Sequence, residues 1–426
     1  MVDKNLFLYD LAVVAIFKDE GRYLKEWLDY HLLAGVEHFY LYNNDSTDDY
    51  KEVLAPYVEK NLVTLTDWPG KLMMYPAYND AIEKHRFECR YMAFIDLDEF
   101  IFPKSNRPVV EVIDEILSHD SNAAALGINW QCFGSNGHEK ADYSRGVLEI
   151  FTRHAKSNQI FLDEDGNKIG SVLVKTIANP RCIAHILNPH FDFYVDGKYT
   201  VNSDGGQILF AINEPPLANK IVINHYIVKS LEEFLLKQNK GRADCNYVLE
   251  NTYFHCYDRN EVFDEGILKY RAARAENFSF ESDEHRANRV INILVQTLTQ
   301  PLPADDDREF FVDKLETFLT CRAVAEKFQI KIGDRSAEEI ALAWIYRTMI
   351  KADPIKRSEI EMFLKALPEI LSRPFPICKE ILQLTQDNII PRFQEHLKNC
   401  KEVVMINELL TYFQWHYVQK FLRFIK

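Results

Sequence analysis

The strongest constraint on the fold is the alternation of short apolar runs with helical patterns over the first hundred residues. The apolar runs are residues 11–17, 38–42, 62–66 and 91–95, and the helical patterns between them cover residues 23–32, 50–58 and 75–87. Nearly continuous apolar strands joined by helices are typical of parallel sheets that are covered on both faces. The sequence therefore predicts an α/β fold with a doubly wound, mostly parallel sheet.

Polar residues follow each of these apolar runs. They are Lys18, Asp19 and Glu20 after the first run, Asn43, Asn44 and Asp45 after the second, Asp67 after the third, and Asp96, Asp98 and Glu99 after the fourth. The carboxyl ends of parallel strands share one edge of a sheet, and ligands of such sheets bind beyond that edge. We therefore expect these polar groups to line one rim.

The pattern changes twice further along the chain. Between about residues 123 and 226, shorter strands and irregular loops predict a mixed extension of the sheet. Helical periodicity returns after residue 281, and Pro301 and Pro303 lie in a stretch typical of a linker. We therefore expect an α/β catalytic domain at residues 1–280 and a helical C-terminal domain at residues 281–426.

Charge, cysteine content and hydropathy narrow the location and the partners. The formal charge of −14 repels a polyphosphate backbone and argues against nucleic-acid binding. The eight cysteines include no C-x-x-C pair, which is typical of reduced thiols in a cytosolic protein. Asp3 and Asp10 interrupt the apolar N-terminus, and no run approaches the roughly 18 apolar residues that a membrane span needs. We expect a cytoplasmic protein without a signal peptide.

Residues 91–102, YMAFIDLDEFIF, carry the most specific chemical signal. Asp96, Asp98 and Glu99 stand between two apolar segments, and buried carboxylates need a cation or hydrogen-bond donors nearby. In an extended strand Asp96 and Asp98 point to the same side, where Mg²⁺ or Mn²⁺ could bind them and bridge to a diphosphate. A solvated turn after a strand is the simpler alternative.

Residues 43–49, NNDSTDD, follow the second strand and precede a helix. Asp45 or Ser46 could cap that helix. Asn44 and Asp45 also share the predicted rim with Asp98, where an amide and a carboxylate could bind a nucleobase edge or ribose hydroxyls. The chain contains no G-x-G-x-x-G and no G-x-x-x-x-G-K-[ST], so dinucleotide and P-loop sites lose their main support.

Several further segments occur in the order found in a known group of enzymes. They are AIFKDEGRYLKEWLDYHLLAGVEHFYLYNNDSTDD, the helix with Ala77, Tyr78 and Asn79, FIDLDEFIF, NWQCFGSNGH, the strand with Lys175, and NHYIVKSLEEFLLKQNKGRAD. Together they span about residues 11–244 and resemble the bacterial glycosyltransferases related to families 2 and 92. The resemblance implies a GT-A fold of the Asp-x-Asp type, a nucleotide-diphosphate sugar donor, Mn²⁺ or Mg²⁺, and inversion at the anomeric carbon.

The resemblance also assigns roles to individual residues. It implies Asp98 as the direct metal ligand, Asp96 as a ligand nearer the donor ribose, and His225 of the His-Tyr motif as a third ligand. The residues expected to bind the donor are Lys18, Glu20, Asn44, Asp45, Asn79, Asp96, Lys229, Lys237, Lys240 and Arg242. The basic residues among them would neutralise the departing diphosphate. On residue type alone, His225 is more often structural and the lysines more often lie on a solvated helix face.

The acceptor side is predicted from an aromatic, Gly-rich loop at residues 130–138, because aromatic rings stack on sugars while backbone amides approach their hydroxyls. The residues expected there are Trp130, Ser135, His138 and His190, with Trp130 as plain core the alternative. Inverting transfer needs a carboxylate that takes the acceptor proton. Asp192 is the first candidate for this base and Asp142 the second.

The sequence thus predicts a metal-dependent inverting glycosyltransferase that acts on a glycan or lipid-linked glycan in surface polysaccharide or lipopolysaccharide assembly. The alternatives are a phosphatase-like hydrolase with Asp96 as nucleophile and Asp98 as acid/base, and a non-catalytic glycan-binding protein. Near the C-terminus, Phe413, Tyr417 and Phe421 share one helical face. That face suits ordinary packing, a partner helix or peripheral contact with the inner face of the membrane.

Overall fold

The computed structural model describes residues 5, 7–156, 160–162, 166, 168–194, 197–244, 250–276, 278–279, 281–282, 285–290, 292, 331–332 and 335–336. By its contacts the chain divides into two units, one of Tyr9–Tyr194 and Lys198–Phe280, the other of Met1–Leu8, Val195–Gly197 and Glu281–Lys426. In the second unit, residues 285–290 are helical and β17 (Lys331–Ile332) pairs antiparallel with β18 (Arg335–Ser336). Most of the predicted helical domain, including Phe413, Tyr417 and Phe421, lies outside the described residues.

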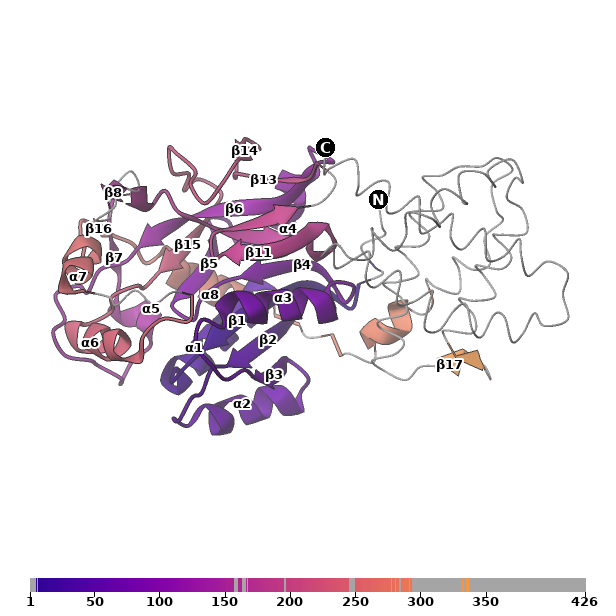
Figure 1. The fold of residues 1–426 in the computed structure, drawn as a ribbon, viewed down its shortest axis with the longest axis horizontal. Coiled ribbons are helices and arrows are strands. Elements are labelled where there is room, and N and C mark those ends of the chain that lie inside the picture. The colour runs from indigo at the N-terminus through magenta and orange to yellow at the C-terminus, as the bar shows by residue number, and fades with distance from the viewer. Residues whose placement is uncertain are drawn as a thin grey trace, which may run out of the picture. The chain divides into compact units, whose positions relative to one another are not determined.

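The first unit is built on a ten-stranded sheet (Figure 1). Its path runs through β14 (Gln207–Ile208), β13 (Tyr199–Val201), β6 (Ala123–Cys132), β10 (Val174–Ala178), β4 (Cys89–Phe94), β1 (Tyr9–Phe17), β2 (His38–Asn43) and β3 (Val63–Asp67). The neighbours β4, β1, β2 and β3 are all parallel. This half of the sheet confirms the strand and helix alternation predicted from the first hundred residues.

Beyond β4 the sheet becomes mixed, as predicted. β10 is antiparallel to both β4 and β6, whereas β13 is parallel to β6. β15 (Ile221–His225) runs parallel to β6 and antiparallel to β5 (Glu99–Pro103). The fold class is therefore the predicted α/β arrangement, a parallel half with a mixed extension.

The helices follow from apolar positions spaced three or four residues apart. In α1 the buried residues include Leu24, Trp27, Leu28 and His31, and the helix ends at Gly35, whose φ of 100° a residue with a side chain rarely adopts. The helices are α1 (Gly21–Ala34), α2 (Tyr50–Glu59), α3 (Met74–His85), α4 (Val109–Leu117), α5 (Val147–Ile150), α6 (Leu231–Lys240), α7 (Asn251–Tyr257) and α8 (Gly266–Glu276). α1 packs against α2, α8 and β5, and α3 against β1 and β11.

Short elements complete the unit. They are β7 (Arg153–His154), β8 (Ile160–Leu162), β9 (Lys168–Gly170), the 3₁₀ turn η2 (Pro180–Cys182), β11 (Ile183–Asn188), β12 (Phe191–Tyr194) and β16 (Val262–Phe263). β11 and β12 form an antiparallel hairpin beside β10. None of the helices in the described part of the chain is long and apolar enough to cross a membrane.

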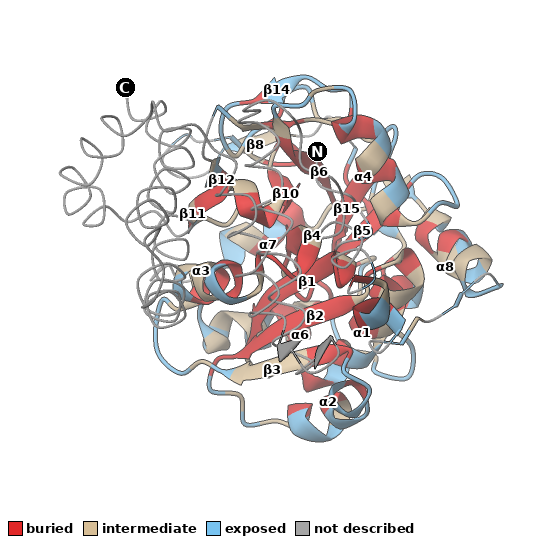
Figure 2. Ribbon diagram, turned by 90° about the vertical axis from the view of Figure 1, so that its right-hand side faces the viewer, coloured by how far each residue is buried: buried red, intermediate tan, exposed pale blue. Residues whose placement is uncertain are grey.

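The core lies along the central strands, which Figure 2 shows as mostly buried. Every residue of β2, β5 and β15 is buried. Because β5 and β15 are both enclosed, their pairing has a fixed register. In this register His225 of β15 lies opposite Glu99 of β5. This register brings the His-Tyr motif to the Asp-x-Asp segment.

Candidate functional site

A cleft of about 430 Å³ opens beyond the carboxyl ends of β1, β2 and β4. Its lining includes most of the predicted site residues: Lys18, Glu20, Asn44, Asp96, Asp98, Trp130, His190, His225, Lys237, Lys240 and Arg242. The expectation that polar groups from several strands meet on one rim is therefore met. Asp45, Asn79, Ser135, His138, Asp142, Asp192 and Lys229 are not among the residues that line this cleft.

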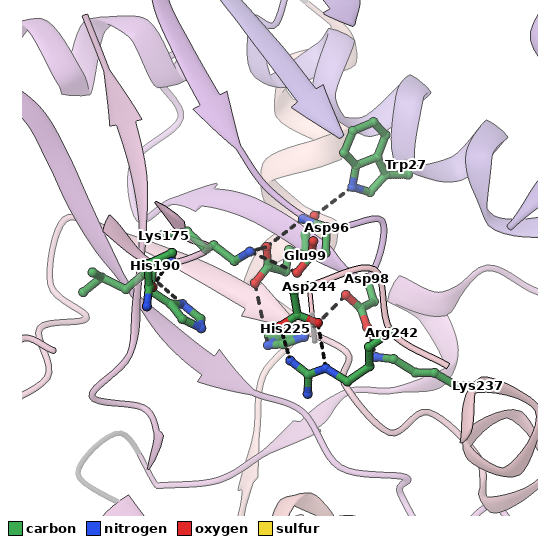
Figure 3. A network of polar contacts seen from close by, with 12 residues as sticks. Trp27, Asp96, Asp98, Glu99, Lys175, His190, His225, Lys237, Arg242 and Asp244 are labelled. Carbon is green, nitrogen blue, oxygen red and sulfur yellow. Dashed lines mark hydrogen bonds and ion pairs between the residues drawn. The ribbon is translucent and has the colours of Figure 1, made fainter. Parts of the chain in front are cut away.

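The Asp-x-Asp segment forms a tight turn between two strands. β4 ends at Phe94 and β5 begins at Glu99, so Asp96 and Asp98 do not lie in an extended strand as predicted. The Asp96 amide donates to Glu99 Oε2 at 2.8 Å, and the Glu99 amide donates to Asp96 O at 3.1 Å. The Trp27 indole N–H donates to Glu99 O at 2.9 Å, which ties α1 to the turn (Figure 3).

Asp98 faces His225 and Lys237. Its Oδ1 lies 3.4 Å from His225 Nε2, and its Oδ2 lies 2.5 Å from Lys237 Nζ. Although burial opposes ionisation, Lys237 and then His225 hold the pKa of Asp98 well below its ordinary value. Burial lowers the pKa of His225, which favours the neutral imidazole that can bind a metal.

Asp96 and Glu99 face a different lysine. Lys175 Nζ lies 3.0 Å from Asp96 Oδ2 and 3.4 Å from Glu99 Oε2 (Figure 3). Burial raises the pKa of Glu99 above its ordinary value, with Asp96 and Asp98 acting in the same direction, whereas the Lys175 ammonium opposes the rise because it favours the carboxylate. Sequence reasoning gave Lys175 no role, although a lone lysine inside the apolar run SVLVKTIA signals a buried acidic partner.

Two of the three predicted metal ligands lie together. Across the residues that the structure describes, no group of three His, Cys, Asp or Glu side chains is placed to hold a metal. Asp98 and His225 lie against each other in the cleft, whereas Asp96 is turned toward Lys175. Mg²⁺ commonly uses one or two carboxylates together with substrate phosphates, and the three-ligand metal site stays a prediction.

The basic rim of the cleft is anchored by α6. A capping box formed by Ser230 and Glu233 starts this helix and fixes the segment that carries Lys237 and Lys240. Lys240 Nζ donates to Lys18 O at 3.1 Å and also contacts the Glu20 carboxylate. The rim therefore joins the first strand end to the helix that follows His225.

Arg242 makes a two-point contact with a carboxylate of the same rim. Its Nε donates to Asp244 Oδ1 at 2.8 Å and its terminal nitrogen donates to Oδ2 at 2.6 Å. Both residues line the cleft. Lys237, Lys240 and Arg242, three of the basic side chains predicted to meet a diphosphate, thus line the cleft and are paired with acids.

The opposite rim is built from the NNDSTDD segment. The Asn44 side-chain Nδ2 donates to Trp68 O at 2.9 Å and to Gly70 O at 2.8 Å, and Asp45 Oδ2 accepts from the Gly70 backbone N–H at 3.0 Å. Both side chains therefore hold the loop at Gly70 against the cleft. Neither Asp45 nor Ser46 caps a helix, because α2 begins only at Tyr50.

Two residues predicted to bind the donor have structural contacts instead. The Asn79 side chain accepts from the Ile186 amide at 2.9 Å and donates to Ile186 O at 2.8 Å, so it joins α3 to β11. Lys229 is buried with Nζ 4.4 Å from the centre of the Tyr23 ring, and burial lowers its pKa. Long-range packing, which local sequence patterns do not encode, sets both positions.

Trp130 and His190 form an aromatic wall. Their ring centres are 4.9 Å apart, and the Trp130 ring centre is also 4.2 Å from that of His225. Trp130 is 7% exposed, and its indole N–H has no hydrogen-bond partner in the described chain. Burial lowers the pKa of His190 to about 3, so this ring is neutral, with Nδ1 2.9 Å from Val174 O. Trp130 is therefore both buried and part of the cleft lining, and its role at the acceptor side stays a prediction.

Ser135 and His138 belong to a loop that packs away from the cleft. The Ser135 amide donates to Asp258 Oδ1 at 2.7 Å, and Ser135 Oγ accepts from the Gly137 amide at 3.0 Å. The loop is held close to the chain near Arg259, since a Cβ on Gly134 would lie 2.5 Å from Arg259 O. Ser135 and His138 belong to the same predicted loop as Trp130, but they do not line the cleft.

Neither candidate base lines the cleft. Asp192 is 5% exposed, accepts from the Tyr194 hydroxyl at 2.9 Å and from Thr176, and burial raises its pKa to about 6. Thr176 follows Lys175 in β10, so Asp192 lies on the opposite face of the sheet from the Lys175 side chain. Asp142 accepts from Ser144 in an exposed turn. The role of base for either residue stays a prediction.

An α/β unit with an acidic turn and basic side chains at the carboxyl edge of its parallel strands defines a polar ligand-binding domain. Residues 13–211 of this unit match the model of glycosyltransferase family 92. A glycosyltransferase family 92 protein of Ricinus communis, RCOM_0530710, is 24% identical over 245 residues, which cover 57% of this chain and 39% of that protein. These matches show that the chain is similar to proteins of glycosyltransferase family 92.

Two further relatives are also plant proteins. Os08g0121900 of Oryza sativa subsp. japonica, of family 92, is 28% identical over 34% of this chain and 24% of its own length. The galactan beta-1,4-galactosyltransferase GALS3 of Arabidopsis thaliana is 31% identical over 31% of this chain and 29% of its own length. The chain thus spans less than half the length of these relatives, and the predicted bacterial group stays a prediction.

Among solved structures, S. aureus TarS 1-349 in complex with UDP is similar at 13% identity and a TM-score of 0.29. The match covers 80% of this chain and 90% of that one.

Proposed function

We propose that this chain is a glycosyltransferase that moves a sugar from a nucleotide-diphosphate donor to a hydroxyl of a glycan. The observation that carries the proposal is the meeting of Asp98, His225 and Lys237 at the carboxyl edge of the parallel strands. An oxygen, a neutral imidazole nitrogen and an ammonium at one point suit a diphosphate with its counter-ion. The family 92 match over residues 13–211 supports the same reaction class.

The metal is part of this proposal. Asp98 and His225 would hold Mn²⁺ or Mg²⁺, which when bound supplies positive charge for the departing diphosphate. Lys237, Lys240 and Arg242 would add charge-assisted hydrogen bonds to the same phosphates. Their present partners Asp98, Glu20 and Asp244 are carboxylates, the anions that a phosphate can replace.

Different parts of the cleft would bind the nucleoside of the donor and the sugar at the acceptor side. Asn44 and the loop at Gly70 would contact the nucleoside, with Lys18 and Glu20 beside them. Trp130 and His190 would contact the sugar at the acceptor side, because both line the cleft and aromatic rings stack on sugars. We include inversion at the anomeric carbon, although neither Asp192 nor Asp142, the two bases predicted from the sequence, lines the cleft.

The proposal extends to the biological setting of the enzyme. We propose a cytoplasmic enzyme of surface polysaccharide or lipopolysaccharide assembly, with peripheral contact at the membrane for a lipid-linked acceptor. The name of GALS3 makes a nucleotide-linked galactose the first donor to test.

A thermal-shift screen of nucleotide sugars, with and without Mn²⁺, tests the proposal. One nucleotide diphosphate sugar should raise the melting temperature of the wild type only when Mn²⁺ is present, and Asp98→Ala should abolish that shift. Glu59→Ala, which removes an exposed acid of α2, is the matched control and should behave as the wild type. Equal shifts for the wild type and Asp98→Ala would contradict the assignment of Asp98. Phosphate release without sugar transfer would favour the hydrolase alternative.

A further inference from the structure

The floor of the cleft contains a lysine that is almost completely enclosed. Lys175 lies in β10, between β4 and β6, and its side chain is 1% exposed. A buried ammonium is costly unless it is paired, and Lys175 is paired twice, with Asp96 at 3.0 Å and Glu99 at 3.4 Å. Burial alone would lower the pKa of Lys175, but Asp96 and then Glu99 raise it above its ordinary value, so the ammonium stays charged.

Lys237 contacts the same acidic turn in a different way. It extends from α6, its side chain is 32% exposed, and its Nζ contacts Asp98 Oδ2 at 2.5 Å and Ile227 O at 3.2 Å. A long, partly solvated side chain can leave its partner at low cost, whereas a lysine enclosed in the central sheet cannot. Within the turn, Asp96 and Glu99 therefore share Lys175 as a permanent counter-ion. Asp98 has Lys237 as a counter-ion that can be exchanged.

We propose that Lys175 is a positioning residue that holds Asp96 and Glu99 as its own counter-ions and so leaves Asp98 as the one carboxylate that exchanges a lysine for a divalent ion. This inference rests on the proposed function, because it concerns the metal of the same cleft. It explains why Asp96, two residues from Asp98, is turned away from the point where Asp98 and His225 meet. Asp96 is then kept for the donor rather than for the metal.

The proposal has a consequence for metal affinity. The Lys175 ammonium repels a divalent ion at Asp98 and withholds Asp96 from it. Asp96 is 32% exposed in its side chain, so it has room to turn once Lys175 is gone. Removing Lys175 should therefore strengthen metal binding in the absence of nucleotide, which is the opposite of what loss of a purely structural residue would do.

The experiment measures Mn²⁺ affinity of the purified full chain without nucleotide, from the paramagnetic resonance signal of free Mn²⁺. Lys175→Met should bind Mn²⁺ about tenfold more tightly than the wild type. Lys175→Arg, which keeps the charge, should stay close to the wild type. Adding Asp96→Asn to Lys175→Met should remove most of the gain, whereas Asp96→Asn alone should change the affinity little.

A second pair of variants serves as a control for misfolding. Lys175→Met leaves the buried Glu99 carboxyl group without its partner, so the comparison is repeated in Glu99→Gln, where a neutral amide replaces that carboxyl group, and circular dichroism checks each protein. A gain in Mn²⁺ affinity in both backgrounds supports the proposal. The proposal would be overturned if folded Lys175→Met, with or without Glu99→Gln, bound Mn²⁺ no more tightly than the same protein with Lys175. It would also be overturned if none of the proteins bound Mn²⁺. Nucleotide titrations of the wild type report separately on the proposed function.

Discussion

His225 Nε2 lies 3.4 Å from Asp98 Oδ1, although the two residues come from distant parts of the sequence. The antiparallel register of β15 on β5, which pairs His225 with Glu99, creates this contact. Both side chains are largely buried yet line the cleft. A polar pair kept at the end of two enclosed strands is the geometric basis of the proposed diphosphate and metal site.

Lys237→Met should change two affinities in opposite directions. Without nucleotide, Mn²⁺ should bind more tightly, because the ammonium no longer occupies Asp98 Oδ2. With Mn²⁺ present, the nucleotide diphosphate should bind roughly tenfold more weakly, because a charge-assisted hydrogen bond to phosphate is lost. Calorimetric titrations measure both. Lys25→Met, which removes a lysine that is 73% exposed on α1, is the control and should leave both affinities unchanged.

Trp27→Phe should destabilise the protein by about 2 to 3 kcal/mol. The indole N–H of this buried residue donates to Glu99 O, and phenylalanine would leave that carbonyl unpaired and a small void. Urea unfolding measures the free energy of unfolding. Trp68→Phe is the matched control, since the Trp68 indole has no hydrogen-bond partner among the residues described. Equal losses for the two variants would contradict the importance of the Glu99 contact.

Asp192→Asn should reduce the pH dependence of stability below neutrality. Burial raises the pKa of folded Asp192 to about 6 from an ordinary value of 3.8, so between these values the folded state binds more protons than the unfolded chain. Stability contributed by this group is therefore lost as pH rises through that window. The variant should gain up to about 3 kcal/mol over the wild type above pH 6. Urea unfolding at pH 4 and pH 7 measures the difference.

The same variant tests Asp192 as the base. Because Asp192 does not line the cleft, Asp192→Asn should keep most of the sugar-transfer rate. A loss of turnover with unchanged donor binding would instead support the sequence prediction.

Asn79→Ala should lower stability without weakening donor binding. The side chain makes two hydrogen bonds to the backbone of Ile186, and their loss should cost about 1 to 3 kcal/mol. The nucleotide affinity of the folded variant should equal that of the wild type, since Asn79 does not line the cleft. A large fall in affinity at unchanged stability would restore the donor-binding role predicted from the sequence.

The parallel half of the sheet could be predicted because its signal is local. The apolar run at residues 11–17 became β1, Tyr9–Phe17, and Lys18 and Glu20 after it line the cleft as expected. The need of buried carboxylates for cations was also predictable from residue types, and Lys175 and Lys237 meet it. The spacing of apolar residues and the positions of polar residues along the chain were sufficient for these conclusions.

The rest depends on contacts between distant segments. The turn that points Asp96 and Asp98 at different lysines follows from the register of β5 and β15 and from the position of β10. Asp192 was a reasonable acid by sequence, but the hairpin of β11 and β12 places it beside Thr176 on the other face of the sheet. Local patterns carry no information about such pairings.

The most direct test of the central claim is a calorimetric titration of a nucleoside diphosphate into the wild type, Asp98→Asn, His225→Gln and the double variant, with and without Mn²⁺. The account predicts Mn²⁺-dependent binding by the wild type, a large loss in each single variant, and little further loss in the double variant, because both residues hold one ion. Binding that ignores Mn²⁺ and is unchanged in Asp98→Asn and His225→Gln would contradict it.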